Sequence, residues 1–155
     1  MIKKGLAYCD NTPLEKMRQE RFDGIASQCR EISVEQNLQE WKEMLLGSER
    51  GKKFCVRAKL SVDSPNKCLR DPVMYRCNDT PHPKTGTKWK AYPTYDFCTP
   101  IIDSIEGVTN MLRTNEYADR NAQYNWFQKV MELRKVNIYD FSRLNFVNTT
   151  LSKRK

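Results

Sequence analysis

The sequence predicts an α/β protein, in which helices and strands of ordinary length alternate along 155 residues. Apolar residues recur at helical spacing in some segments and at every second position in others. The composition is 39% hydrophobic and 30% charged with only 6 glycines and 7 prolines, which excludes collagen-like and wholly disordered chains. No uncharged run approaches the roughly 20 apolar residues of a membrane span, so no membrane partner is expected.

Two helices are predicted in the first fifty residues. The first has Asn11 or Thr12 as its cap, Pro13 at its first position and an apolar set formed by Leu14, Met17, Phe22 and Ile25. The second begins at Ser33, with Gln36 completing a capping box, and ends at Gly47. Its apolar stripe, which predicts core packing more than base stacking, consists of Val34, Leu38, Trp41 and Leu45.

A change to period-two alternation over residues 54–60 predicts a strand. Its second face carries Arg57 and Lys59, and this basic face either meets solvent or lies along a phosphate backbone. Further strands are expected at 70–77 and 89–92, joined by a loop at 81–86.

The remaining chain alternates helix and strand, which predicts part of an open parallel sheet. A helix is expected from Thr99 or Pro100 to Glu106, ended by Gly107, and a second helix over 120–133. The accompanying strands are predicted at 108–112, 136–139 and 144–146.

The net charge of +8 favours phosphate-rich partners, although a generic basic surface explains it equally well. The six cysteines form no Cys-x-x-Cys pair and His82 is the single histidine, so free, mostly buried thiols are expected and a zinc site is not. The first residues lack the apolar core of a secretory signal, which predicts a cytoplasmic location.

Ordered sequence blocks in the second part resemble glutamyl-tRNA synthetase of the eukaryotic and archaeal type, a class I aminoacyl-tRNA synthetase. They are Tyr92-Pro93-Thr94-Tyr95-Asp96-Phe97, Asp103-Ser104-Ile105-Glu106-Gly107-Val108-Thr109, Leu112-Arg113-Thr114-Asn115-Glu116-Tyr117, Ser142-Arg143-Leu144-Asn145 and Leu151-Ser152-Lys153-Arg154-Lys155. Three earlier stretches, 5–13, 56–59 and 70–76, resemble the inserted module of the same family that binds the acceptor stem.

The resemblance implies two parts. Residues 1–92 would form the acceptor-stem-binding α/β insertion, and residues 93–155 would form the second half of a Rossmann-like catalytic domain that ends on the Lys-Met-Ser-Lys-Ser-type loop. The His-Ile-Gly-His-type ATP motif of the family is not found in the sequence, so the chain resembles a fragment that we expect to be inactive alone.

The family's reaction joins glutamate to ATP, used with Mg²⁺, and then passes the acyl group to the terminal adenosine of the tRNA. The resemblance assigns catalysis to Ser152 and Lys153, and ATP binding to Thr114, Arg143, Leu144, Leu151, Ser152 and Lys153. It assigns glutamate binding to Tyr95 and Arg113, because a guanidinium can grip a carboxylate with two parallel hydrogen bonds. Without the resemblance, Arg113 would be interpreted as an ordinary arginine at the end of a strand, paired with Glu106, Glu116 or Asp119.

The implied tRNA contacts are Asp119, as a reader of a guanine amino group in the minor groove, and the phosphate contacts Arg57, Arg70 and Arg76. Asn110 stands where the family commonly has histidine. No protein-bound metal and no DNA partner are expected.

Two alternatives remain. One is a fragment of a glutaminyl-tRNA synthetase, which tends to lack a basic residue at the position of Arg113. The other is a non-catalytic module for tRNA binding or assembly. Membership of a multi-synthetase assembly is possible under either interpretation.

Overall fold

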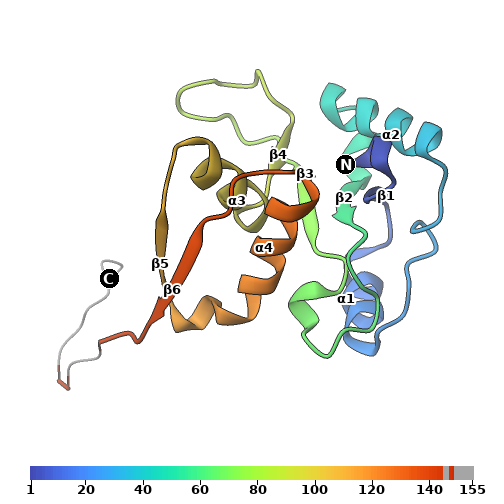
Figure 1. Ribbon diagram of the computed structural model, residues 1–155. Coiled ribbons are helices and arrows are strands. Elements are labelled where there is room, and N and C mark those ends of the chain that lie inside the picture. Colours follow the sequence, from blue (N-terminus) through green and yellow to red (C-terminus); the bar gives the residue numbers. More distant parts are fainter. Residues whose placement is uncertain (145–146, 149–155) are drawn as a thin grey trace.

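The computed structural model describes residues 1–144 and 147–148 and shows a mixed α/β fold with two sheets (Figure 1). Its helices are α1 (Leu14–Asp23), α2 (Val34–Leu46), α3 (Tyr95–Ile105) and α4 (Asn121–Val130). Its strands are β1 (Ala7–Asp10), β2 (Cys55–Ala58), β3 (Val73–Cys77), β4 (Ala91–Pro93), β5 (Asn110–Thr114) and β6 (Asn137–Phe141). Four short 3-10 turns accompany them: η1 (Ile2–Lys4), η2 (Gly51–Lys53), η3 (Lys67–Leu69) and η4 (Asn115–Arg120).

The first sheet is antiparallel throughout, in the order β1-β2-β3-β4. The second sheet pairs β5 with β6 in parallel, with α4 in the connection between them. The parallel pair agrees with the prediction of parallel pairing in this part of the chain. In Figure 1, α3 and α4 lie between the two sheets, so they join the two parts of the molecule.

The two sheets share one apolar core. Phe97 of α3 and Phe127 of α4 belong to the same buried cluster as Val56 and Met74 of the first sheet. The two phenylalanine rings meet edge to face, with 5.0 Å between their centroids, an arrangement that adds to the stabilisation from burial. Residues on both sides of the expected boundary at 92 therefore contribute to one core.

Local signals explain both ends of α2. The Ser33 hydroxyl accepts a hydrogen bond from the Gln36 backbone N–H at 3.2 Å, which satisfies a donor that the first turn leaves free. At the other end Gly47 has φ 66°, a left-handed conformation that glycine adopts without steric cost, and its N–H bonds to the carbonyls of Glu43 and Met44. The predicted helix and both of its ends are confirmed.

Two predicted helix starts are wrong. Pro13 itself is the N-cap residue of α1, without a side-chain cap, because the Asn11 Oδ1 atom accepts the Cys29 thiol and the Thr12 hydroxyl is hydrogen-bonded to the Ser27 hydroxyl. Helix α3 begins at Tyr95 and includes Pro100 in its interior, whereas the proline was expected at the first turn. Helix α4 begins within one residue of its predicted start but ends at Val130, short of the predicted Leu133, and Glu132 just beyond it has φ 58°, which is not a helical conformation. Most of the strand predicted at 144–146 lies outside the described residues.

All six cysteines are free thiols, as expected, but the expectation that most are buried is wrong, since Cys9 and Cys29 are buried and the other four are partly exposed. Burial raises the pKa of the Cys9 thiol to about 12. No helix among the described residues is long and apolar enough to cross a membrane.

Candidate active site and nucleic-acid interface

A pocket of about 370 Å³ at the β5–β6 pair brings together three of the predicted site residues, Tyr95, Arg113 and Thr114. Arg113 and Thr114 come from the end of β5, and Tyr95 comes from the first turn of α3. Asp103, Tyr117 and Phe141 line the same pocket. The sequence-based interpretation did not assign these three residues, since nothing in the local pattern distinguishes them from packing residues.

Arg113 is the unusual group in this pocket because its charge is buried without an ion pair to any of residues 1–144 and 147–148. The side chain is 7% exposed, and its Nη1 atom is buried with no hydrogen-bond partner among the described residues. Its guanidinium carbon lies 4.8 Å from the ring centre of Tyr117 and 5.8 Å from that of Tyr124. Ring faces offset part of the cost of desolvating a cation, but they do not replace an anion.

The acidic neighbours do not supply that anion. The expected alternative, a pair with Glu106, Glu116 or Asp119, is wrong, since Glu116 faces Arg143 at 3.5 Å and the Arg113 Nη1 has no partner. Asp103 accepts the Tyr124 hydroxyl at 2.9 Å. Burial and this hydrogen bond raise the pKa of Tyr124, so the phenol stays neutral. Within the described part of the chain, the Arg113 cation thus has no anionic partner, while Asp103 is hydrogen-bonded to Tyr124 and Glu116 is paired with Arg143.

The predicted ATP-binding residues are only partly visible. Thr114 lines the pocket, whereas Arg143 lies outside its lining and is exposed. Leu144 is 69% exposed. Leu151, Ser152 and Lys153 lie outside the described residues. No group of three or more metal-ligating side chains is found within the described part of the chain.

The strand face that carries Arg57 was expected either to meet solvent or to lie along a phosphate backbone, and at Arg57 it does neither. Arg57 is 3% exposed, and its Nη1 donates to the Asp10 carboxylate at 2.7 Å while its Nε donates to the Asp71 carbonyl at 2.9 Å. Burial by itself opposes ionisation of Asp10, yet hydrogen bonds from Thr12 and Arg57 hold the pKa of this carboxyl below its ordinary value. The expected contact of Arg57 with phosphate is therefore wrong, because this buried ion pair occupies the guanidinium.

Arg70 is also engaged within the fold. Its Nη1 donates to the carbonyls of Arg21 and Phe22 at 2.9 and 2.7 Å, and its Nε donates to the Ser64 carbonyl at 2.7 Å. These bonds fasten the end of α1 to the loop between β2 and β3. The structure gives Arg70 this role in place of the expected phosphate contact.

Arg76 differs from both, because its side chain on β3 is exposed. It lines two adjoining hollows, of which the larger measures about 720 Å³ and also has Arg18, Lys52 and Lys53 around it. The second hollow reaches Asp96, which follows Tyr95 in the chain, and Arg120, the last residue of η4. A basic groove therefore runs from α1 towards the pocket of Arg113.

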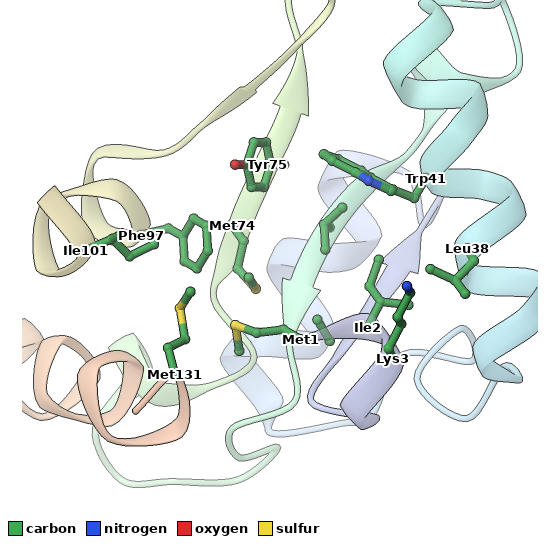
Figure 2. Close-up of a pocket in the computed structure, with 12 residues that line it drawn as sticks. Met1, Ile2, Lys3, Leu38, Trp41, Met74, Tyr75, Phe97, Ile101 and Met131 are labelled. Atoms are coloured by element: carbon green, nitrogen blue, oxygen red, sulfur yellow. The ribbon is translucent and has the colours of Figure 1, made fainter. Parts of the chain in front are cut away.

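A further hollow of about 390 Å³ lies between η1, α2 and β3 and differs in character (Figure 2). Trp41 and Tyr75 meet there edge to face at 5.0 Å, and Met74, Phe97 and Met131 complete much of its apolar lining. Burial raises the pKa of the Tyr75 phenol. Trp41 thus packs with the core, as its helical stripe predicted.

The mixed α/β fold is consistent with the catalytic domain of a class I aminoacyl-tRNA synthetase. The family model described as tRNA synthetases class I (E and Q), catalytic domain, matches residues 1–155, and the chain belongs to this family.

Three relatives are similar to this chain over its whole length. The chain is 64% identical to the cytoplasmic glutamate–tRNA ligase of Saccharomyces cerevisiae and 57% identical to the probable cytoplasmic glutamate–tRNA ligase of Schizosaccharomyces pombe. Each alignment covers 100% of this chain and 22% of the relative. The chain is also 56% identical to the bifunctional glutamate/proline–tRNA ligase of Drosophila melanogaster, covering 9% of that protein. It therefore spans less than a quarter of the length of these relatives.

Proposed function

We propose that the chain is the part of a cytoplasmic glutamate–tRNA ligase that binds the glutamate side chain and the tRNA acceptor stem. The observation that carries this proposal is the buried guanidinium of Arg113, which has no counter-ion within the described part of the chain and lies in a pocket shared with Tyr95. The γ-carboxylate of glutamate supplies a matching anion and accepts two parallel hydrogen bonds. The high identity to proteins named glutamate–tRNA ligases supports the same substrate.

The runner-up substrate is glutamine. A neutral amide would leave the Arg113 charge unpaired in a buried pocket, and an unpaired buried charge is strongly unfavourable. The structure therefore favours glutamate over glutamine. The alternative of a non-catalytic tRNA-binding module gains no support from a pocket that is equipped for an acidic amino acid.

In the proposed reaction, the α-carboxylate of glutamate attacks the α-phosphate of ATP, which forms glutamyl adenylate and releases pyrophosphate. A ribose hydroxyl of the terminal adenosine of the tRNA then takes the acyl group, and AMP leaves. Charge builds up on the phosphates in the first step, and we assign its stabilisation to Lys153 with Ser152, and ATP contacts to Thr114, Arg143, Leu144 and Leu151. Mg²⁺ would accompany ATP as part of the substrate.

The proposed division of labour keeps residues 1–92 as the acceptor-stem module and 93–155 as the second half of the Rossmann-like catalytic domain. Arg76 is the phosphate contact retained from the sequence, with Asp119 as the minor-groove reader. The bifunctional relatives raise membership of a multi-synthetase assembly as a further property of the longer protein. Such a fragment would not aminoacylate alone.

The test of glutamate recognition uses the full-length protein that contains this chain, with tRNA present. Arg113→Cys should reduce kcat/KM for glutamate in ATP–pyrophosphate exchange by at least about 100-fold, because removing one partner of a buried charged contact costs about 3 kcal/mol or more. Arg113→Lys keeps the charge but loses the paired geometry, and should recover activity only in part. Lys129→Cys, which removes an exposed cation on α4, is the matched control. Unchanged glutamate preference in Arg113→Cys would refute the assignment.

The tRNA interface is tested by binding of a glutamate-accepting acceptor minihelix over a salt series, with a glutamine-accepting minihelix for comparison. Arg76→Ala should reduce the slope of the logarithm of the binding constant against the logarithm of the salt concentration by about one, while Lys129→Ala should leave this slope unchanged. An unaltered slope in Arg76→Ala would remove this residue from the interface.

A further inference from the structure

The turn η4 carries side chains that face two different sites. Tyr117 lies against Arg113 at 4.8 Å and against the ring of Tyr95 at 6.0 Å, so one side of the turn forms a wall of the glutamate pocket. Two residues further on, the Asp119 side chain is exposed, and its carboxylate has no hydrogen bond or ion pair recorded with residues 1–144 or 147–148. A carboxylate in this state is free to accept a hydrogen bond from a ligand.

One end of the turn is anchored to α3. The Arg120 Nε donates to the Asp96 carboxylate at 3.1 Å, and the Arg120 guanidinium also lies over the Tyr117 ring at 5.1 Å. These contacts involve only residues of the second part of the chain. They fix the pocket side of η4 but do not hold the backbone at Asp119.

The backbone at Asp119 is held by a residue from the first part. The side-chain amide of Asn66 donates to the Asp119 carbonyl at 2.7 Å, across 53 residues of sequence. The Asn66 Oδ1 atom accepts the Cys68 backbone N–H at 2.9 Å and thereby caps η3. The oxygen of the Asn66 side-chain amide is therefore bonded within η3, and its nitrogen is bonded across to η4.

The loop that presents Asn66 is itself fixed to α1 through two arginines. Arg21 donates to the carbonyls of Arg70 and Lys67 at 2.9 and 3.2 Å, while Arg70 donates back to the carbonyls of Arg21 and Phe22. This reciprocal exchange holds both ends of η3. Asn66 therefore projects from a rigid support, which is the condition for positioning another residue accurately.

We propose that Asn66 is a positioning residue that sets where the Asp119 carboxylate meets the minor groove of the acceptor stem, and so contributes to tRNA choice. This inference rests on the proposed function. The guanine amino group is the single hydrogen-bond donor that distinguishes base pairs in the minor groove. A hydrogen bond to it requires a separation near 2.7–3.2 Å, so a displacement of about 1 Å at the turn would remove the contact.

The experiment measures tRNA charging by the full-length protein, using glutamate tRNA in which inosine replaces guanosine at each of the first acceptor-stem pairs in turn. Inosine lacks the 2-amino group, and the wild-type protein should show a roughly 10-fold lower kcat/KM at the pair that Asp119 reads. Asn66→Asp keeps the acceptor for the Cys68 N–H but loses the donor to Asp119. In this variant, and in Asn66→Ala, the inosine penalty should fall to less than about 2-fold.

The matched control is Asn78→Asp. Asn78 accepts the Thr80 N–H at 3.0 Å in a similar local turn away from η4, so the control introduces the same charge without touching Asp119. It should keep the full inosine penalty. The KM for glutamate in the Asn66 variants should stay within about 2-fold of wild type, because Arg120 still anchors the pocket side of the turn.

Each result that departs from these expectations overturns the inference. A full inosine penalty in both Asn66 variants removes its positioning role. A parallel rise in the KM for glutamate shows that η4 as a whole has collapsed and that Asn66 is a general structural residue. A wild-type protein that charges glutamate tRNA but ignores inosine removes the Asp119 reading and the inference with it, whereas a protein that does not charge glutamate tRNA refutes the proposed function itself.

Discussion

Replacing Arg57 with methionine separates a buried structural ion pair from a contact with RNA. Asp10 and Arg57 are 1% and 3% exposed and lie 2.7 Å apart, and Arg57 also holds the Asp71 carbonyl. Methionine fills much of the same volume but leaves the Asp10 carboxylate with the Thr12 N–H as its remaining donor. We expect a loss of about 3–5 kcal/mol in the free energy of unfolding, the usual cost of an uncompensated buried charge.

The assay is urea unfolding of the chain near neutral pH, with thermal unfolding as a second measure. The expected loss corresponds to a fall in Tm of roughly 10 °C for a chain of this size. The double variant Asp10→Asn with Arg57→Met should be more stable than Arg57→Met alone, because no charge is left unpaired. Arg18→Met is the control, since its pair with Glu15 is exposed and should contribute less than about 1 kcal/mol.

A cost below about 1 kcal/mol for Arg57→Met would refute this reasoning. If that variant also lowered the salt dependence of minihelix binding by about one ion, Arg57 would return to the RNA interface. If Arg57→Met lowers stability and the variant that remains folded binds the minihelix with an unchanged salt dependence, Arg57 acts only within the fold.

Three further predictions follow from local chemistry. Asp10 has a pKa below its ordinary value of 3.8, so its contribution to stability should be complete above that pH and lost as the pH falls further. Urea unfolding between about pH 5 and 2 should show this loss in the wild type; an equal loss in Asp10→Asn would contradict the assignment to Asp10. Ser33→Ala removes the cap of α2 and should cost about 1 kcal/mol in urea unfolding; no change would mean that solvent replaces the cap. Burial raises the pKa of Cys9 to about 12, so iodoacetamide at mildly alkaline pH should modify the half-buried Cys98 before it modifies Cys9. Peptide mass spectrometry can show the order, and modification of Cys9 before Cys98 would contradict the burial of Cys9.

The elements that the sequence predicted well are those with complete local signals. Helix α2 has its cap at Ser33 and its terminal Gly47 within one segment, so its two ends needed no tertiary information. Its apolar stripe was predicted less well, since Leu45 is 47% exposed and the buried residues of the helix are Asn37, Glu40 and Met44. Helix α3 was placed too late because Pro100 resembles a first-turn proline. The helix continues through it because Phe97 and Pro100 are both buried, and tertiary packing outweighs the local preference.

The candidate site was harder to predict because burial is a tertiary property. Alternation correctly separated Arg57 from Val56 and Ala58, but it could not show that Asp10 and Asp71 cover the basic face. The role of Arg113 came from the family resemblance, and its missing counter-ion became visible only in the fold. Asn66 carries no sequence signal, because its partner lies 53 residues away.

The shared core also determines when this polypeptide can acquire its native packing. Ala7, Val56 and Met74 emerge from the ribosome well before Phe127, yet all four side chains belong to one cluster. During synthesis the first sheet must therefore persist with an open apolar face until α4 has been made. Such an interval exposes surface on which chaperones and unwanted association compete. During translation, the chain is therefore most prone to unwanted association between the completion of β4 and the docking of α4.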